Sequence, residues 1–551
     1  SDNNVPVQPG GETKQLDELD RVFIQISDER NRFTAGDFQL KKPQGYFMTY
    51  FKRAQGGLYQ RGDGNGKEDY WEASASVSKG RFGRNLIQGI EGNQGPYRLT
   101  GSEGETFIVI LAGTEQVFID GRLLQRGQDA DYVIDYNSAE ISFTPRQFIT
   151  KDRRIVVEFQ YSDKRYARPL VTASVFKTSR RGHYYVNVYS ENDAKNQPLQ
   201  QDLTDLDRAL LANSGDNPVG ATRSGIRLGN FEYNQVMYVL QDSLGFDSVL
   251  VYSTDTSSAK ATASFSFVGA GNGDYVEDGF TSAGKKYRWL LPQVSGDDTI
   301  HYGNYSPVYV LFAPSQQQMV SCGTRWQVND ALVVSAEAAV SNKDRNSFSP
   351  EGNSDNVGSA FMASMQLGGR PSDNSVSLSA EGRYEYVNRR FSQVERFREV
   401  EFARNWNLPT SIQTGDQQWL HVSPALRFKQ KGSVKLAMDY LDAKGLQQGR
   451  KVSSSVKLEQ RDNWKIDGTA SYLNVSGSSA SEFVRHKSEW TKWLGSYSIM
   501  FKDEHEWNRR FDNDNSSLRN DSYRFYDWEG SIGTIDTVKR AVRVHYRERF
   551  E

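Results

Sequence analysis

Hydrophobic and polar residues alternate along the last part of the chain, from Gln318 to Phe550. In the segment Ser375–Tyr386, the apolar positions are Val376, Leu378, Ala380, Gly382, Tyr384 and Tyr386. The positions between them are Ser375, Ser377, Ser379, Glu381, Arg383 and Glu385. Because successive side chains of a β-strand point to opposite faces, this pattern predicts a strand with one apolar and one charged face. A tilted strand of ~9–11 residues is long enough to cross a bilayer.

The links between these segments alternate in length. Short links are predicted at 329–330, 369–374, 430–432, 461–463, 492–494 and 533–536, and long polar links at 342–357, 388–417 and 504–522. Outer-membrane barrels have tight turns at one end and long external loops at the other, whereas a soluble meander has no reason to keep its long loops on one side. The alternation therefore favours a transmembrane β-barrel over a soluble sheet.

The two faces of the predicted strands differ in charge. Lys and Arg are almost absent from the apolar face, where Gly and Ala suit lipid better than an interlocking core. We expect lipid contact for Val376, Leu378, Tyr384, Leu436, Met438, Trp464 and Ile466. We expect the lumen to be lined by Glu381, Arg383, Glu385, Lys435, Asp439, Lys457, Glu459 and Asp467. This mixed charge is compatible with a wet pore and with charge pairing against a plug.

Changes in the pattern of apolar and polar residues divide the chain into five parts. We expect N-terminal barrel strands in 1–91, an inserted β-sandwich module in 92–163, a barrel hairpin in 164–191, a second inserted domain in 192–316 and barrel hairpins in 317–551. In the module, both faces of several strands are apolar, as a two-layer sandwich requires. Asp120-Gly121 predicts a tight hairpin turn there.

The second inserted domain contains the one convincing helical pattern, near Thr204–Asn213. Asp202 or Thr204 is the expected N-cap and Gly215 the stop signal. Its expected apolar stripe is Leu203, Leu206, Leu210 and Leu211. The fold class predicted for the whole chain is all-β, an antiparallel barrel or part of a larger one, with inserted β-sandwich and mixed α+β domains.

Composition excludes several classes of protein. The 551 residues contain 67 basic and 69 acidic side chains, so no basic field argues for nucleic acid. A single cysteine, Cys322, excludes an intramolecular disulfide framework. Continuous apolar runs of about 18 residues, which a transmembrane helix needs, do not occur. The chain opens without a signal peptide and stops inside a strand pattern at Glu551, so we expect a processed chain or a fragment.

Candidate chemistry is sparse. The six histidines, at 183, 301, 421, 486, 505 and 545, show no metal-ligand spacing, and no nucleophile, phosphate-loop or paired-acid motif is present. Acidic loops at Gly62–Asp69 and Asp512–Asn515 contain carboxylates of the kind that bind Ca²⁺, but a solvated loop is the simpler interpretation. We therefore expect no enzyme activity and no cofactor, with loop-bound Ca²⁺ as the one alternative. Cys322 falls on an apolar face and is expected to be inert.

Several stretches resemble large outer-membrane proteins of Bacteroidota. They are Asn4–Gly11 leading into Asp20–Gln25, Ala35–Phe38, Gly92–Leu99 and the unit Val117–Thr144. The last unit is also similar to the small β-modules of the gliding-motility and type IX translocon barrels (SprA/Sov). This resemblance implies the outer membrane of a Gram-negative bacterium, and it extends over most of the first 400 or so residues. In the similar proteins more strands precede the first of these stretches, and no catalytic residues are implied.

Pattern and resemblance together predict a non-enzymatic outer-membrane barrel protein in protein translocation or envelope assembly. Its expected partners are outer-membrane lipid and other envelope proteins of a complex. The alternative is a cell-surface binding or adhesion protein built of β-modules. A carbohydrate-active enzyme would need two facing carboxylates in a cleft, and no pair stands out.

Overall fold

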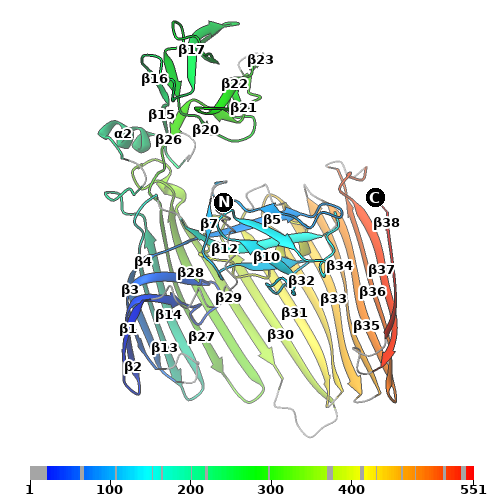
Figure 1. Ribbon diagram of the computed structural model, residues 1–551. Helices are drawn as coiled ribbons and strands as arrows, with labels where there is room; N and C mark the ends of the chain where they lie inside the picture. The colour runs from blue at the N-terminus through cyan, green and yellow to red at the C-terminus, as the bar shows by residue number, and fades with distance from the viewer. Residues whose placement is uncertain are drawn as a thin grey trace, which may run out of the picture.

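A long antiparallel sheet of 18 strands dominates the structure, a computed structural model shown in Figure 1. The structure describes residues 22–62, 68–102, 104–105, 108–151, 153–162, 165–199, 202–216, 221–295, 298–368, 376–409, 415–429, 431–460, 463–477, 480–512, 517–534 and 541–550. Two inserted domains account for most of the remainder. The predicted all-β fold class with antiparallel barrel-type strands is confirmed.

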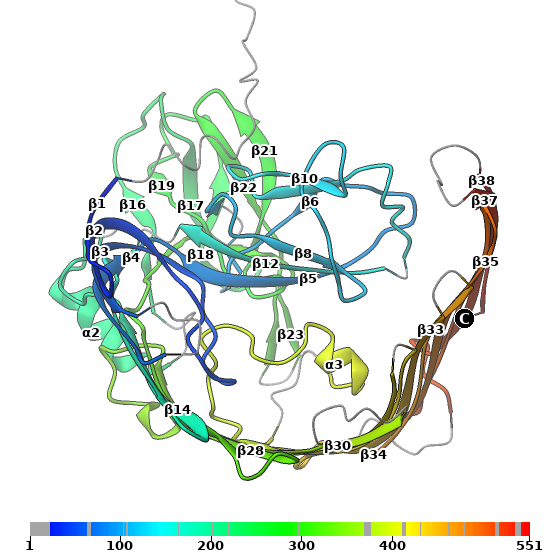
Figure 2. The same ribbon diagram turned by 90° about the horizontal axis from the view of Figure 1, so that it is seen from below.

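The large sheet, called the wall, pairs each strand with the next one in chain order. Its strands are β1 (Phe23–Ser27), β2 (Asn31–Leu40), β3 (Lys52–Arg61), β4 (Tyr70–Ser78), β13 (Pro169–Ser179), β14 (Gly182–Asn192), β27 (Gln316–Gln327), β28 (Leu332–Asp344), β29 (Val357–Leu367), β30 (Val376–Val387), β31 (Gln417–Phe428), β32 (Gly432–Ala443), β33 (Gln447–Gln460), β34 (Trp464–Gly477), β35 (Ser481–Leu494), β36 (Tyr497–Arg510), β37 (Tyr523–Thr534) and β38 (Ala541–Phe550). Figure 2 shows that the wall curves into an open trough. Among the described residues, β1 and β38 are its two edges and do not pair with each other.

The two ends of the wall differ as the link lengths predict. Both inserted domains and the links 345–356 and 388–416 leave from one end, called the loop end. The opposite end carries short links such as 180–181, 328–331 and 495–496. The alternation is incomplete, because the loop-end link 444–446 is also short. Two predicted link edges are wrong: β35 includes Lys492–Leu494, and β36 continues through Glu504 to Arg510.

The first insertion, called the module, comprises residues 81–162. Its strands are β5 (Arg81–Gln88), β6 (Tyr97–Arg98), β7 (Val109–Ile110), β8 (Gln116–Ile119), β9 (Arg122–Leu123), β10 (Tyr132–Asp135), β11 (Glu140–Phe143) and β12 (Arg154–Ser162). They form two sheets over one apolar core that includes Leu99, Ile141 and Val157. The predicted boundary at residue 91 is wrong by one strand, because β5 pairs along its whole length with β12. Alternation alone does not tell which sheet a strand joins.

The predicted turn at Asp120-Gly121 is confirmed. It connects β8 to β9 through the pair Ile119 and Arg122. Both turn residues have positive φ, 50° and 81°, as a two-residue type I′ hairpin requires. A Cβ atom on Gly121 would lie 3.1 Å from Cγ of Glu401, so glycine lets this turn approach a distant segment closely.

The second insertion lies beyond the loop end, above β13 and β14 in Figure 1. Its elements are α2 (Asp205–Asn213), β15 (Thr222–Ser224), β16 (Ile226–Leu228), β17 (Met237–Ser243), β18 (Phe246–Tyr252), β19 (Ala261–Ala263), β20 (Ser266–Phe267), β21 (Tyr275–Thr281), β22 (Gly284–Trp289), β23 (Gln293–Ser295), β24 (Asp298–Ile300), β25 (Tyr305–Ser306) and β26 (Val308–Val310). Thr204 is the N-cap of α2 and forms a capping box with Asp207. Of the expected apolar stripe, Leu211 is buried, but Leu206 is 70% exposed and was assigned wrongly.

The link between β30 and β31 turns into the trough instead of outward. Its residues 388–409 are called the strap and include α3 (Phe402–Asn405), which Figure 2 shows inside the curve of the wall. Phe391 and Phe397 pack against Phe47. Trp406 is fully buried among Leu441, Leu473 and Phe483 of the wall. The prediction of a long external loop at 388–417 is therefore wrong, because the strap lies inside the trough. Its many charged residues are what indicated a solvent-exposed loop.

Trp406 anchors the strap, because Gly449 leaves room for its ring: a Cβ atom on Gly449 would lie 2.9 Å from Cε3 of Trp406. We expect Trp406→Ala to cost about 3–5 kcal/mol of strap attachment. Trypsin should then cut the strap arginines faster, as gel and mass analysis of a digestion time course would reveal. Tyr233→Ala, at an 85% exposed aromatic residue, is the control. An unchanged digestion rate for Trp406→Ala would contradict this anchoring role.

Candidate functional site

Three layers meet inside the trough. The module lies within the curve of the wall, and the strap lies between the module and strands β30–β36 (Figures 1 and 2). The strap is therefore placed to contact both partners, and its charged side chains do so in two sets.

The first set joins the strap to the module. Arg396 of the strap donates to both carboxylate oxygens of Glu158 on β12, over 2.6 and 3.0 Å. Arg84 on β5 also pairs with Glu158, at 3.2 Å, and donates to the carbonyl of Val400. A bidentate, charge-assisted pair fixes orientation as well as distance. Burial and the nearby Arg396 lower the pKa of Arg84, against the opposing effect of Glu158.

The second set joins the strap to the wall. Nε of Arg398 lies 2.7 Å from Glu385 on β30, a carboxylate with no solvent exposure that also accepts from the hydroxyl of Tyr46. Arg404 donates to Glu506 on β36 over 2.7 Å. Glu506 is 2% exposed and also pairs with Arg485 at 2.9 Å. Buried carboxylates held by cations from a separate segment lock that segment in register.

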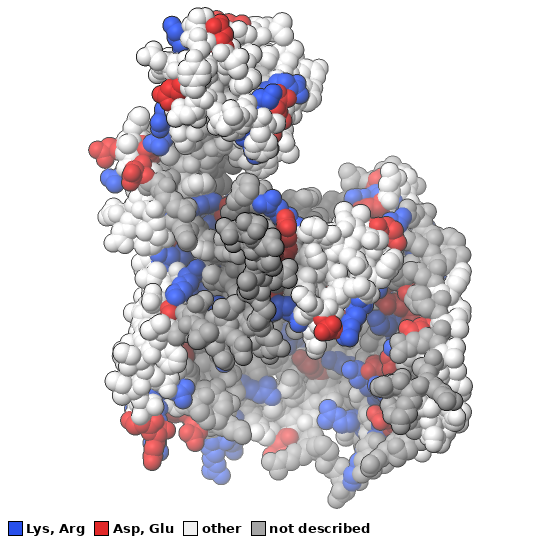
Figure 3. Space-filling model, in the orientation of Figure 1, with Lys and Arg blue, Asp and Glu red and all other residues white. Residues whose placement is uncertain are grey.

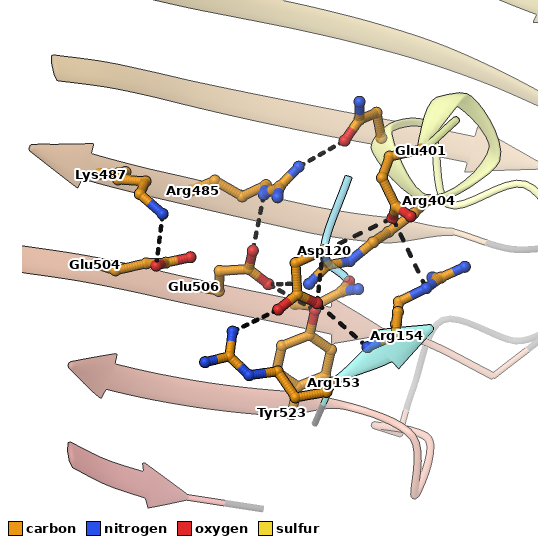
Figure 4. Close-up of polar contacts among 12 residues, drawn as sticks. Asp120, Arg153, Arg154, Glu401, Arg404, Arg485, Lys487, Glu504, Glu506 and Tyr523 are labelled. Atoms are coloured by element: carbon orange, nitrogen blue, oxygen red, sulfur yellow. Dashed lines mark hydrogen bonds and ion pairs between the residues drawn. The ribbon is translucent and has the colours of Figure 1, made fainter. Parts of the chain in front are cut away.

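Module, strap and wall meet at one junction, shown in Figure 4. Asp120, at the module turn, lies 2.6 Å from Arg153 and 4.0 Å from Arg404. Glu401 of the strap lies 3.8 Å from Arg154 of the module and 3.8 Å from Arg404. Burial lowers the pKa of Arg154, and the neighbouring Arg404 adds to this effect. The junction therefore connects module, strap and wall through alternating charges.

Glu395 is a strap carboxylate in an unfavourable setting. It lies between Gln160 of the module, whose amide nitrogen is 3.3 Å away, and the Lys52–Glu191 ion pair of the wall. Burial raises the pKa of Glu395 to about 7, although Lys52 opposes the shift. Its charge state therefore changes near neutral pH.

The residues expected in the lumen lie on the inner face of the wall. Arg383, Lys435 and Asp439 line a cavity described below, and Glu385 holds the strap. Glu381 lies 3.5 Å from Arg383, and Asp467 lies 4.0 Å from Lys457. Glu459 is exposed and lies opposite Lys465 on the neighbouring strand.

The residues expected to face lipid lie on the outer face. Leu378 is 68% exposed and Met438 58% exposed. Val376, Tyr384 and Leu436 are also exposed, whereas Trp464 and Ile466 are half-buried. Cys322 is exposed.

A cavity of about 580 Å³ lies between the strap and the inner wall. Phe402 and Arg398 of the strap cover one side of it, and strands β30–β36 form the other. Figure 3 shows the hollow below the module, where basic and acidic side chains gather side by side. Its wall side carries hydroxyl groups at Ser453, Ser455 and Ser471.

The charged residues of the strap and module were missed by the sequence interpretation. The strap mixes acidic and basic residues from Glu395 to Arg404, and this run was the available signal. Mixed charge in a long link also fits a solvated loop, so the run alone does not predict burial.

Within the described ranges, three or more His, Cys, Asp or Glu side chains never group closely enough to hold a metal ion. The loops considered for Ca²⁺ have residues 63–67 and 513–515 outside the described residues. Helices long and apolar enough to cross a membrane are absent from the described part of the chain.

Comparison with known proteins gives few matches. A family model described as "Domain of unknown function (DUF8818)" matches residues 82–163, which coincide with the module. No curated protein sequence matches the chain. The solved structures include an E. coli P pilus tip assembly intermediate, PapC-PapD-PapK-PapG, at 9% identity and TM-score 0.26, covering 93% of this chain and 50% of that one. The P pilus usher (PapC) translocation pore matches at 10% identity and TM-score 0.22, covering 94% of both chains.

The raised pKa of the buried Glu395 predicts that the stability of the folded protein depends on pH. In the folded protein the pKa of Glu395 is about 7, above its usual value of 4.5. Below pH 4.5 the carboxyl group is protonated in both the folded and the unfolded chain, so it costs no stability. As the pH rises from 4.5 to about 7, the unfolded chain ionises first and the stability of the folded protein falls. We expect the folded protein to lose about 1 kcal/mol of stability between pH 6 and pH 8 through this group. Thermal unfolding followed by tryptophan fluorescence at both pH values measures the loss.

Glu395→Gln should flatten this dependence and raise the unfolding midpoint at pH 8. Glu351→Gln, at an exposed carboxylate, is the matched control and should keep the wild-type slope. If Glu395→Gln kept that slope as well, Glu395 would not be the titrating group.

Proposed function

We propose that the protein is a non-enzymatic outer-membrane β-barrel protein acting in protein translocation or envelope assembly. In this proposal the wall crosses the membrane and the module is a plug that the strap holds inside. The observation that carries it is a folded domain fixed by ion pairs inside a curved wall with an apolar exterior. A Gram-negative, Bacteroidota-like outer membrane is the proposed location.

The exterior of the wall supports a lipid environment. Nearly every wall strand exposes large apolar side chains, among them Trp71, Val171, Val186, Val340, Phe361, Leu378, Leu420, Met438, Val452, Tyr472, Trp490, Phe501, Ile532 and Val544. Exposed apolar surface of this extent is rare on soluble monomers and favours association or aggregation in water. In a bilayer the same surface replaces lipid–water contact and is stabilising.

The arrangement of the strap supports a plug that can be displaced. Its contacts with the module are mainly ion pairs and hydrogen bonds, whose polar groups water can hydrate once the two surfaces separate. Its contact with the wall includes the buried Trp406 and is stronger. The module therefore separates from the strap at lower cost than the strap separates from the wall, and a passage opens along the inner wall.

Partners follow from the same geometry. The second inserted domain projects from the loop end (Figure 1), where it is free to meet other envelope proteins. It exposes Tyr233, Phe280 and Leu228 at 85%, 78% and 72%. The same residues favour the second candidate function, a surface protein that binds or adheres through this domain.

Membrane insertion is tested by expressing the full chain and fractionating the cells. We expect the protein in the outer-membrane fraction, with migration on a gel that changes after heating. The adhesion alternative predicts a chain that folds and stays soluble without detergent, and that result would reject the barrel proposal.

The plug role is tested by planar-bilayer conductance. We expect the wild type to stay mostly closed, and Glu158→Ala with Arg396→Ala to increase the open fraction severalfold, because the bidentate strap–module pair is lost. Glu277→Ala with Lys285→Ala, which removes a pair in the second inserted domain, is the matched control. Equal conductance of all three proteins would rule out gating by the module.

A further inference from the structure

The cavity between the strap and the inner wall contains two amines without an acidic partner. Most of the cations around it are neutralised: Arg398 by Glu385, Arg485 by Glu506 and Lys487 by Glu504. Lys435 and Lys451 differ, because no described carboxylate lies within 4.0 Å of either amine. Lys451 instead lies 4.5 Å from the centre of the Trp406 ring. Asp439 lies opposite Lys451 in the strand register, but its carboxylate is engaged by Trp419 at 3.0 Å and by His421 at 2.7 Å.

Strand register fixes the spacing of these two amines. Lys435 on β32 lies directly opposite Ser455 on β33. Lys451 lies on β33 four residues before Ser455. At ~3.3 Å per residue, the two lysines are separated by about 13 Å along the strand direction. A single small anion is therefore too short to reach from one lysine position to the other, whereas an elongated ligand parallel to the strands can span both.

The surface between the lysines suits a polypeptide backbone. Ser453, Ser455, Thr469 and Ser471 line it, and Ser453 and Ser455 pair across the strands with Ser471 and Thr469. Hydroxyl groups both donate and accept, so they match the alternating amide and carbonyl groups of an extended chain. Carboxylates four residues apart on such a chain are also separated by about 13 Å.

The aromatic residues of the cavity argue against a stacked ligand. The indole nitrogen of Trp419 donates to Asp439 over 3.0 Å. The Trp419 ring is contacted by Phe402, at 5.9 Å between centres, and by the guanidinium of Arg383 at 6.0 Å. A sugar ring or a nucleobase needs a free aromatic face, and Trp419 is already engaged.

We propose that this cavity binds an extended acidic polypeptide segment, with two carboxylates about four residues apart paired to Lys435 and Lys451 and its backbone bonded to the serine and threonine hydroxyls. The inference rests on the proposed function for its meaning, since it names acidic segments as the class of chain that the barrel receives. The site itself is defined by the geometry of the inner wall.

Binding is measured by fluorescence anisotropy with the full chain in neutral detergent. The probe is a labelled heptapeptide, Ser-Asp-Ser-Gly-Ser-Asp-Ser, and its Asn-substituted form is the neutral comparison. We expect binding of the acidic peptide alone, weakened by added salt. Lys435→Gln and Lys451→Gln should each reduce affinity about fivefold, and the double variant about 25-fold, because the sites are far enough apart to act independently.

Matched variants separate binding from folding. Lys457→Gln removes an amine from the same strand that lies 4.0 Å from Asp467, and it should leave affinity unchanged. Lys451→Arg keeps the charge over Trp406 and should restore affinity. Affinity that survives in the double variant, or falls equally in Lys457→Gln, would overturn the assignment.

Two further ligands test the class of the occupant. Succinate is too short to reach both lysines, so complete competition by succinate at equal carboxylate concentration would reduce the site to a small-anion site and overturn the proposal. A uronic-acid oligosaccharide that bound more tightly than the peptide would do the same. Binding in detergent does not depend on membrane location, so loss of peptide binding in a protein that fractionates with the outer membrane would refute this inference alone.

Discussion

The buried contact between Arg404 and Glu506 is the constraint on which the interior of the protein depends. Neither side chain can be left alone away from water, because an unpaired buried charge costs several kcal/mol. Arg404 belongs to the strap and Glu506 to β36, so the pair determines where the strap lies on the wall. Arg485, Asp120 and Glu401 then take positions set by this pair (Figure 4). The module is oriented by that arrangement.

Such pairs contribute to specificity more than to stability. The desolvation cost of each buried ion nearly offsets its attraction to a partner, so a well-packed apolar contact would hold as firmly. On the wall side, the packing of Trp406 against Leu441, Leu473 and Phe483 is an apolar contact of this kind. On the module side the described contacts of the strap are mainly ion pairs and hydrogen bonds, chiefly Arg396 with Glu158. The strap is therefore attached to the wall by apolar packing as well as ion pairs, and to the module mainly by ion pairs.

Much of the wall was predictable from the sequence, because its strands obey one local rule. Alternation with period two places Leu378 outside and Glu385 inside without knowledge of any neighbour. The Asp120-Gly121 turn was predictable for the same reason, since its backbone preference is local. The placement of β5 and of the strap was not predictable in this way. Arg396 and Glu158 are separated by 238 positions, and neither residue carries a local signal of the other.

The strands that flank each insertion are direct neighbours in the wall. β4 pairs with β13, β14 with β27, and β30 with β31. Each insertion therefore begins and ends about one strand spacing apart, ~4.8 Å, as an ordinary hairpin tip does. Replacing any of them by a two-residue turn would leave the strand order and the register of the sheet intact. The contents of the trough are thus separable from the trough itself, and one scaffold can acquire, lose or exchange an interior domain without being rebuilt.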